Sequence, residues 1–500
     1  MDKQSTPDEL FTFKDGRALM DERLSSIMYY IKSRQPEQFD WTSTGYEWNE
    51  MGMAELFSEC YGDTIRYCPE VKSWFTYSEG AWRRDAGGLL VAEKMKEFVR
   101  LMGLYCWEIA DEDKRKAYLE FVNRMGDRRF RDRVIRDAES ECCIPFARFD
   151  NDPYLINCLN GTYDLRKMRF REHNPEDYLT MQTNFSHTVR EDIRCERWEQ
   201  FVDEVTEGNA DKADFLQRAL GYSMLGMANE ECMFILHGKT TRNGKSTMLN
   251  TVQHLLGDYA AVSPVAIICQ TGRSRDSGAA DPMLANLKGK RFVTMSESNQ
   301  YGRLDEEAIK QMTGGEAITA RALYSAPTTF KPQFTLWLSC NDLPSVSDKS
   351  IFASERIHVV EFNRHFGKDE QDKDLKTLFE QPESMQGIFM WLLRGYMRYK
   401  RNGLRMSVEM REVVARYERD NDVVLQFLHE RTQRDEKARV SLKTLYGAYK
   451  LWANSNGFKV MSSKTFAKNM AGHPEMYGAV LRPQNKVVYD GLSLASEIPI

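Results

Sequence analysis

One glycine-containing stretch, residues 238–247, combines the residue types that hold a nucleoside triphosphate. It reads Gly-Lys-Thr-Thr-Arg-Asn-Gly-Lys-Ser-Thr, follows the apolar run 233–236 and precedes helically spaced apolar residues over 248–256. A strand, a glycine loop ending in Gly-Lys-Ser and a helix form the context of a phosphate-binding loop. Backbone N–H groups would cradle phosphate oxygens, Lys245 would bridge the β- and γ-phosphates, and Ser246 would hold Mg²⁺. We therefore predict ATP and Mg²⁺ as ligands, with these ATP-binding residues: Gly238, Arg242, Asn243, Gly244, Lys245, Ser246 and Thr247.

The spacing of the two glycines departs from the usual loop. Five residues separate Gly238 from Gly244, whereas four is the common number. Lys239 occupies the position at which the first glycine is usual. Gly244, Lys245 and Ser246 are therefore the firm part of the prediction, and the role of Gly238 stays open.

A phosphate-binding loop needs polar groups at the ends of neighbouring strands. Glu297 follows the apolar run 291–295, and we expect it to orient the attacking water and support Mg²⁺. Ser296 stands where many such proteins carry a second acid, so the support of the metal is open. Asn341 follows the run 334–338 and is the candidate for sensing the γ-phosphate; the alternative is a turn-forming Asn before Leu-Pro.

Arg356 precedes another apolar run, residues 359–362. A planar guanidinium suits the charge that develops on a transferring phosphoryl group. We expect Arg356 to reach the ATP of a neighbouring subunit. The alternative is a surface arginine paired with Glu355.

Short apolar runs alternate with helical stretches through the centre of the chain, which indicates a multidomain α/β protein with a mostly parallel sheet covered on both faces. We read residues 197–227 as helical, and the chain as helical again after about residue 366. The expected divisions are an N-terminal α+β domain (1–195), a helical collar (196–228), the P-loop core (229–366), a helical connector (367–436) and a C-terminal unit (437–500).

Composition limits the classes of partner. The 500 residues carry a net charge of −5, so contact with nucleic acid must be local rather than spread over the surface. The ten cysteines include no C-x-x-C pair, which argues against a zinc module and for free thiols. Neither a secretory signal nor a membrane-spanning run is present. We expect a soluble, cytoplasmic protein without a membrane partner.

The order of these motifs resembles superfamily 3 helicases, and most closely the phage and plasmid primase–helicase group, which is related to the poxvirus primase–helicase. The loop 242–247, Ser296-Glu297, the segment 310–321, Ser339-Cys340-Asn341 and Arg356 resemble that group's motifs in order. Outside the motor, residues 150–165 and 445–466 are similar to its preceding domain and its C-terminal winged-helix unit. The resemblance implies an AAA+-like P-loop core.

The same resemblance implies a homohexameric ring that binds ATP between subunits and passes single-stranded DNA through its centre. In this family a hairpin after the acidic strand touches DNA in the pore. Mapped onto this chain, the basic candidates are Lys310, Arg321 and Lys331. A few such contacts per subunit, repeated round a ring, do not require a basic protein.

The C-terminal unit carries a local excess of basic residues. Residues 437–486 hold nine lysines and arginines against a single acid, Glu475. Ser462 and Ser463 could cap a helix over 464–470 that places Lys464 and Lys468 on one face. A winged helix would contact duplex DNA there; a solvated amphipathic helix is the alternative.

Together these features predict a replicative DNA helicase of a phage or mobile element, acting in the cytoplasm of a bacterial host on single-stranded and forked DNA. A separate primase or a single-strand-binding protein is a candidate partner. Two alternatives stay open. One is a bifunctional primase–helicase, although residues 1–200 show no convincing cluster of carboxylates or zinc ligands. The other is an origin-binding ATPase without processive unwinding.

Overall fold

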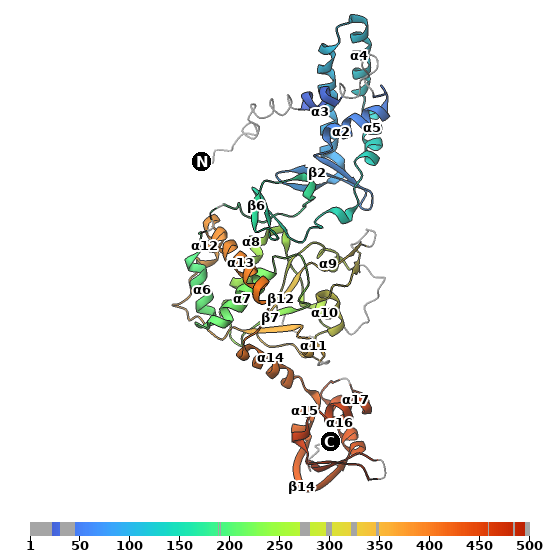
Figure 1. The fold of residues 1–500 in the computed structure, drawn as a ribbon. Coiled ribbons are helices and arrows are strands. Elements are labelled where there is room, and N and C mark those ends of the chain that lie inside the picture. The colour runs from blue at the N-terminus through green and yellow to red at the C-terminus, as the bar shows by residue number, and fades with distance from the viewer. Residues whose placement is uncertain are drawn as a thin grey trace, which may run out of the picture.

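The computed structural model describes residues 23–30, 46–188, 190, 192–270, 281–296, 303–321, 328–346, 350–458, 460–483 and 486–495, apart from the side chain of Glu108. The chain is elongated (Figure 1). A group of N-terminal helices lies at one end, a layered α/β body lies in the middle, and a small C-terminal unit lies at the other end.

The central sheet has five strands in the order β13-β7-β12-β9-β8, and every neighbouring pair is parallel. The strands are β7 (Met233–His237), β8 (Ala260–Val262), β9 (Phe292–Ser296), β12 (Thr335–Cys340) and β13 (Ile357–Glu361). Strands β7 and β12 are buried along their whole length, because helices cover both faces of a parallel sheet. The predicted multidomain α/β class with a parallel sheet is confirmed.

Successive residues of a strand point to opposite faces, and the sheet therefore divides two hydrophobic cores. Phe234, Leu236 and Trp337 belong to the core on one face. That core is completed by α6 (Glu196–Thr206), α7 (Ala210–Tyr222), α8 (Lys245–Leu256), α12 (Leu375–Phe379) and α13 (Pro382–Asn402). Met233 and Ile235 belong to the opposite core, with α9 (Pro282–Ala285), α10 (Glu306–Thr313), α11 (Ser350–Ala353) and α14 (Val408–Asp420).

The stretch 197–227, expected to be helical, contains two helices. Helix α6 ends at Thr206, Glu207 adopts φ 57°, and the Asn209 side chain accepts a hydrogen bond from the Lys212 backbone N–H to begin α7. An αL residue ends a helix, and an Asn N-cap begins the next one. The break lets α6 and α7 pack beside α13 on the same face of the sheet (Figure 1).

The N-terminal part contains α2 (Glu50–Tyr61), α3 (Leu89–Tyr105), α4 (Glu112–Met125) and α5 (Arg128–Glu141) around a core of their own. It also contains the antiparallel strands β1 (Ile65–Cys68), β2 (Ser73–Ser78) and β3 (Ala81–Asp85). Strands β4 (Leu155–Cys158), β5 (Gly161–Asp164) and β6 (Arg169–Arg171) form a second antiparallel sheet. Ile156 and Leu165 of this segment share a core with α6 and α7, so packing is continuous across residue 195.

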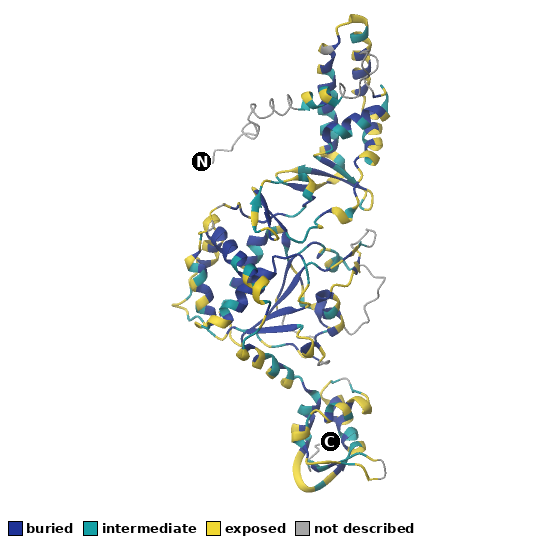
Figure 2. Cartoon of the chain, viewed as in Figure 1, coloured by how far each residue is buried: buried dark blue, intermediate teal, exposed yellow. Residues whose placement is uncertain are grey.

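The C-terminal unit consists of α15 (Val423–Arg431), β14 (Thr432–Ser441), α16 (Leu442–Ser455), α17 (Ser463–Met470), β15 (Val480–Leu481) and β16 (Val488–Leu494). The strands form an antiparallel sheet in the order β14-β16-β15. Its core contains Phe427, Tyr449, Trp452 and Phe466. Figure 2 shows buried residues inside this unit and exposed residues on its outer side. The expected boundary at residue 436 falls inside β14.

Two expectations from composition can be compared with the described residues. All ten cysteines are free, and only Cys143 is exposed, which agrees with the free thiols predicted. Among the residues that the structure describes, no helix is long and apolar enough to cross a bilayer.

Candidate nucleotide-binding site

The predicted phosphate-binding loop joins β7 to α8 at the carboxyl edge of the sheet. Strand β7 ends at His237, and α8 begins at Lys245. Because the sheet is parallel, the carboxyl ends of β12 and β13 lie at the same edge. The loop therefore sits where the other predicted polar groups can reach it, and its helix presents a backbone N–H terminus that suits an anion.

Position 238 requires a glycine, because the surrounding atoms leave no room for a Cβ. A Cβ on this residue would lie 2.4 Å from the Phe362 carbonyl oxygen and 2.5 Å from Asn243 Nδ2. Gly244 adopts φ 86° and packs against Val205, whose Cγ1 would lie 2.5 Å from an added Cβ. The loop thus closes with five residues between two obligatory glycines.

The ammonium of Lys245 points into the loop rather than into solvent. Its side chain is buried, and Nζ donates to the Gly238 carbonyl oxygen at 3.0 Å and to Asn341 Oδ1 at 3.1 Å. Asn341 directly follows β12. The sequence assigned these residues to one site from motifs 96 positions apart, and the fold brings them into contact.

Asn243 shapes the loop. Its side chain is buried. Nδ2 donates to the Thr240 carbonyl oxygen at 2.6 Å and to the Gly238 carbonyl oxygen at 3.5 Å. Ser246 is exposed at the first turn of α8, and Thr247 is half-buried beside it. Arg242 is exposed with φ 58°. Ser246 and Arg242 are accessible to a ligand at the helix N-terminus, whereas the Asn243 side chain forms hydrogen bonds within the loop.

The segment after β13 holds the outer side of the loop. Phe362 N–H donates to the His237 carbonyl oxygen at 2.7 Å, and Phe366 N–H donates to that of Arg242 at 2.9 Å. His365 Nδ1 lies 2.8 Å from the Thr241 carbonyl oxygen. No sequence motif marked this contact, because it depends on β13 pairing with β7 in register.

His237 is a second feature that sequence reasoning missed. Burial lowers the pKa of its imidazole; Glu361 opposes the shift and Lys245 adds to it. His237 and Glu361 are partners across the β7–β13 register. The ring is therefore neutral at pH 7, which leaves Lys245 as the buried cation of the loop. A single histidine at a strand end carries no spacing signal.

Glu297 lies outside the described residues, and its proposed role stays a prediction. Strand β9 ends one residue earlier at Ser296, which pairs with Ser339 of β12. Among the described residues no three His, Cys, Asp or Glu side chains group to hold a metal. Mg²⁺ in such loops is bound by a hydroxyl and by phosphate oxygens, and Ser246 at the start of α8 fits that role.

Arg356 lies at the opposite edge of the sheet from the loop. Its carbonyl oxygen accepts from Met233 N–H at the start of β7, and a five-residue strand spans roughly 16 Å. The guanidinium donates to Thr313 Oγ1 at 2.9 Å and pairs with Glu231 Oε2 at 2.5 Å. The alternative partner named from the sequence, Glu355, is thus wrong, because strand pairing brings Glu231 closer. Arg356 does not reach the loop of its own subunit.

The residues expected to touch DNA fall into two groups. Strands β10 (Ile318–Ala320) and β11 (Thr328–Phe330) form the antiparallel hairpin, with Arg321 and Lys331 exposed just beyond its strands. Lys310 instead lies on α10, where Nζ donates to Ser350 Oγ at 2.8 Å. In the C-terminal unit Ser462 caps α17, which leaves Lys464 and Lys468 exposed.

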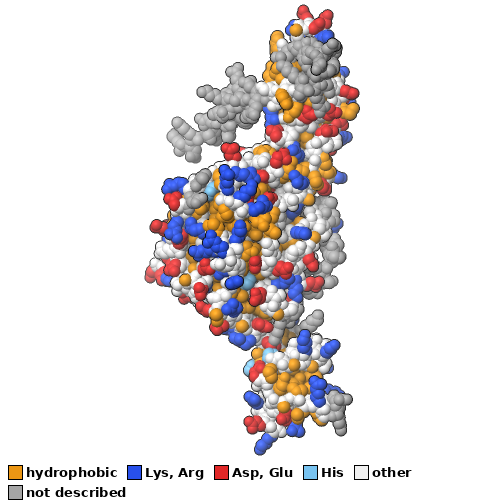
Figure 3. All heavy atoms as spheres, in the orientation of Figure 1, with side chains coloured by type: hydrophobic (Ala, Val, Ile, Leu, Met, Phe, Trp, Pro, Cys, Tyr) orange, Lys and Arg blue, Asp and Glu red, His pale blue; other side chains and the backbone are white. Residues whose placement is uncertain are grey.

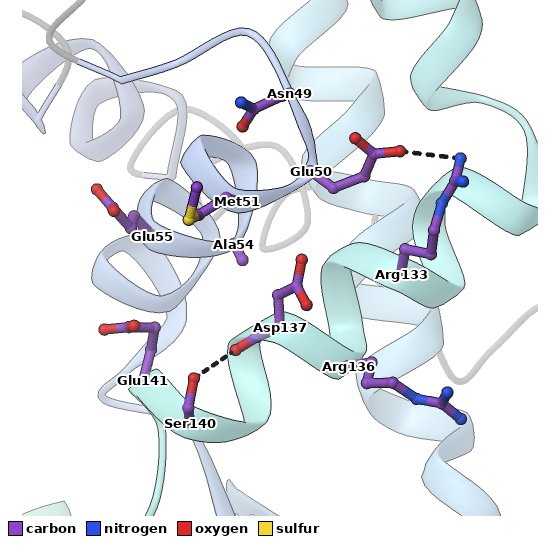
Figure 4. A pocket seen from close by; sticks show the side chains of 10 residues that line it. All are labelled: Asn49, Glu50, Met51, Ala54, Glu55, Arg133, Arg136, Asp137, Ser140 and Glu141. Carbon is purple, nitrogen blue, oxygen red and sulfur yellow. Dashed lines mark hydrogen bonds and ion pairs between the residues drawn. The ribbon is translucent and has the colours of Figure 1, made fainter.

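A separate hollow of about 610 Å³ lies between α2 and α5. It is lined by both signs of charge, and Glu50 pairs with Arg133 at 2.9 Å across it (Figure 4). The hollow lies in the N-terminal helices and contains none of the residues predicted to bind nucleotide. Eight of its ten lining residues are polar or charged, whereas a small-molecule pocket is usually lined by apolar side chains.

Three family models match along the chain. Residues 54–207 match "D5 N terminal like", residues 236–356 match "Family of unknown function (DUF5906)", and residues 419–489 match "Poxvirus D5 protein-like". The two D5 models flank the loop-bearing sheet in the order of the predicted resemblance. Over residues 54–207 and 419–489 the chain is similar to poxvirus D5-like proteins. This confirms the relationship to the poxvirus protein inferred from the motifs.

Curated relatives of this chain carry helicase names. "Putative helicase L207/L206" of Acanthamoeba polyphaga mimivirus is 27% identical over 450 residues, covering 82% of this chain and 46% of the relative. "Putative helicase 022R" of Frog virus 3 is 25% identical and covers 68% and 41%. "Putative helicase V13" of Sputnik virophage is 26% identical and covers 37% and 25%. The chain spans less than half the length of these relatives.

The origins of these relatives do not support a bacterial host. They come from a mimivirus, a frog virus and a virophage. Among solved structures, "The apo structure of NrS-1 C terminal region (305-718)" covers 86% of this chain and 96% of that chain at 10% identity, with a TM-score of 0.48. A TM-score below 0.5 does not establish a shared fold. The fold of this chain is therefore defined by its own strand order.

Proposed function

We propose that this chain is an ATP-hydrolysing DNA helicase that acts in replication. The observation that carries the proposal is the meeting of Lys245 and Asn341 at the mouth of a glycine loop, on the carboxyl edge of a five-stranded parallel sheet. A buried lysine in the first turn of a helix, with a polar amide from the adjacent strand, is suited to bind and sense a triphosphate. The helicase names of the relatives support the same class of activity.

ATP fits the donors that the loop presents. The Lys245 ammonium now donates to the Gly238 carbonyl, and a phosphate oxygen would take up the same donor. Ser246 would support Mg²⁺, and Arg242 and Thr247 would line the phosphates. Bound ATP supplies the phosphoryl group that is transferred to water. Asn341 would position the γ-phosphate, and Glu297 is proposed to orient the water.

Three parts of the chain would couple hydrolysis to movement on DNA. The β10–β11 hairpin follows the acidic strand and carries Arg321 and Lys331, whose charges would track a single strand in the centre of a homohexameric ring. Arg356, which does not reach its own loop, is proposed to serve the ATP of a neighbouring subunit after releasing Glu231. The C-terminal unit is proposed to act as a winged helix, with Lys464 and Lys468 of α17 on the duplex.

Strand displacement tests the proposal. The protein is mixed with a forked DNA whose one strand is labelled, with ATP and Mg²⁺, and with a non-hydrolysable ATP analogue as the control. We expect release of the labelled strand with ATP only. ATP-dependent binding to the fork without any release would favour the origin-binding ATPase, and primer synthesis from nucleoside triphosphates on a single-stranded template would favour the primase–helicase.

A further inference from the structure

Two stretches of this acidic chain contain basic residues and no acid. Residues 165–171 read Leu-Arg-Lys-Met-Arg-Phe-Arg, and residues 394–405 carry five further lysines and arginines. The whole chain has a net charge of −5. Clustered cations in an acidic protein are the local signature of phosphate contact, and neither stretch belongs to the ATP site or to the residues proposed above for DNA.

The fold places the two stretches side by side. The first is the β5–β6 turn with β6, and the second is the C-terminal half of α13 with the turn after it. Arg166 lies 4.3 Å above the ring of Tyr154. Tyr163 of β5 packs edge-on against Phe389 of α13, with ring centroids 5.7 Å apart, and Tyr154 packs against the core that contains Tyr396 of α13. Burial raises the pKa of Tyr396 to about 12, and Tyr154 and Arg166 shift it in opposite directions. Lys400 Nζ lies 5.8 Å from the Tyr396 ring.

The space-filling view shows the result as a surface. Lysine and arginine side chains gather over β6 and beside α13, and they border an apolar strip (Figure 3). We call this surface the β6–α13 face. It is defined by the residues Tyr154, Arg166, Lys167, Arg169, Arg394, Arg398, Lys400 and Arg401.

Only part of this positive charge is neutralised. Ion pairs join Arg166 to Asp152 at 2.9 Å, Arg394 to Glu199 at 3.1 Å and Arg398 to Asp214 at 2.9 Å. The remaining four cations are exposed and have no ion pair among the described residues: Lys167, Arg169, Lys400 and Arg401. The Asp164 carboxylate nearby accepts from the backbone N–H groups of the β5–β6 turn. These four cations therefore give the β6–α13 face a positive electrostatic potential.

We propose that the β6–α13 face binds single-stranded nucleic acid outside the motor's proposed pore. Lys167, Arg169, Lys400 and Arg401 contact the phosphate backbone. The Arg166 guanidinium, whose Cζ lies 4.3 Å from the centre of the Tyr154 ring, offers its outer surface for stacking to a base, because arginine planes and aromatic rings are the platforms on which unpaired bases stack. A duplex has no free base faces and would use the cations alone. This site is additional to the proposed helicase function and does not depend on hydrolysis.

Equilibrium binding tests the proposal with the full chain. The fluorescence anisotropy of a labelled 30-nucleotide single strand is measured without ATP at several salt concentrations. The wild type is compared with Lys167→Ala/Arg169→Ala/Lys400→Ala/Arg401→Ala. The control also loses four exposed cations, at Lys116→Ala/Arg129→Ala/Lys373→Ala/Arg411→Ala. DNA, RNA and duplex versions of the oligonucleotide are compared in parallel.

The expected results are specific to the face. The variant binds at least about tenfold more weakly near 0.1 M salt, and its salt slope falls by about 3, since each lost phosphate contact of a single strand contributes roughly 0.7. The control binds as the wild type does. Arg166→Ala weakens single-strand binding more than duplex binding, because it removes the stacking plane. Light scattering and ATP hydrolysis without DNA are unchanged in the variant.

Three outcomes overturn the proposal. One is equal binding by the variant and the wild type, which leaves the proposed helicase function intact. Another is a variant that loses assembly but not binding, which makes the face a contact between subunits. The third is a wild type that binds no nucleic acid, which refutes the helicase proposal as well.

Discussion

Gly238→Ala tests the loop geometry most sharply, because the sequence left this glycine open and the structure gives it no room. The added Cβ would lie 2.4 Å from the Phe362 carbonyl oxygen, against an ordinary contact of 3.4 Å or more. The loop or the strand end must therefore shift by about 1 Å. The shift also moves the carbonyl that holds Lys245 Nζ at 3.0 Å. A displacement of this size in a reacting group costs about 10²-fold in rate, which is about 2.7 kcal/mol.

Three measurements on the Gly238→Ala protein separate an effect on catalysis from an effect on folding. ATP hydrolysis gives kcat/KM, titration with a fluorescent ATP analogue gives affinity, and a thermal melt gives stability. We expect kcat/KM to fall about 100-fold and stability to fall by about 1–3 kcal/mol from overpacking. Gly367→Ala is the matched control, because its Cβ would meet only Glu370 Oε2 at 3.6 Å. A Gly238→Ala protein that binds and hydrolyses ATP like the wild type would refute the described loop.

Three further predictions follow from buried or paired groups. Arg291→Met should lower the free energy of unfolding by about 3 kcal/mol or more in a denaturant titration, since it leaves the buried carbonyls of Met224 and Leu155 without their donor; a wild-type midpoint would contradict this. Burial lowers the pKa of His358 to about 4 from 6.5, so the native state excludes a proton that the unfolded chain takes up below pH 6.5. Between pH 6.5 and 4 the free energy of unfolding of the wild type should therefore fall by about 3 kcal/mol more than that of His358→Phe. Denaturant titrations that show the same pH dependence for both proteins would refute this. Arg356→Ala and Lys245→Ala should each lack ATPase activity and regain part of it when mixed, because a mixed interface joins an intact loop to an intact arginine; no recovery would argue against action between subunits.

The parts of the fold that the sequence predicts are those with a local cause. Buried parallel strands appear as apolar runs such as 233–236, and Ser462 marks the start of α17 because a serine hydroxyl accepts from the first turn. Strand β8 has only three residues, Ala260–Val262, and lies at the edge of the sheet without full burial. Such a strand is too short to show a run of apolar residues or an alternation of apolar and polar residues in the sequence.

The parts that the sequence misses depend on pairing between distant segments. The partner of Arg356 is Glu231 rather than the adjacent Glu355, because β13 and β7 pair in register. The β6–α13 face brings residues 166–169 close to residues 394–401, because the β5–β6 segment packs against α13. The contact between Lys245 and Asn341 could be predicted only because both follow parallel strands, whose carboxyl ends meet at one edge.

ATP hydrolysis in the presence of single-stranded DNA, compared between the wild type and Lys245→Ala, is the decisive test of the proposed motor. Phosphate release is measured with and without DNA, and Lys373→Ala serves as a variant that loses an exposed lysine outside residues 238–247. We expect DNA-stimulated hydrolysis by the wild type and by Lys373→Ala. We expect none by Lys245→Ala, which should still melt cooperatively. Hydrolysis by Lys245→Ala at the wild-type rate would contradict the assignment of the loop, and with it the proposed motor.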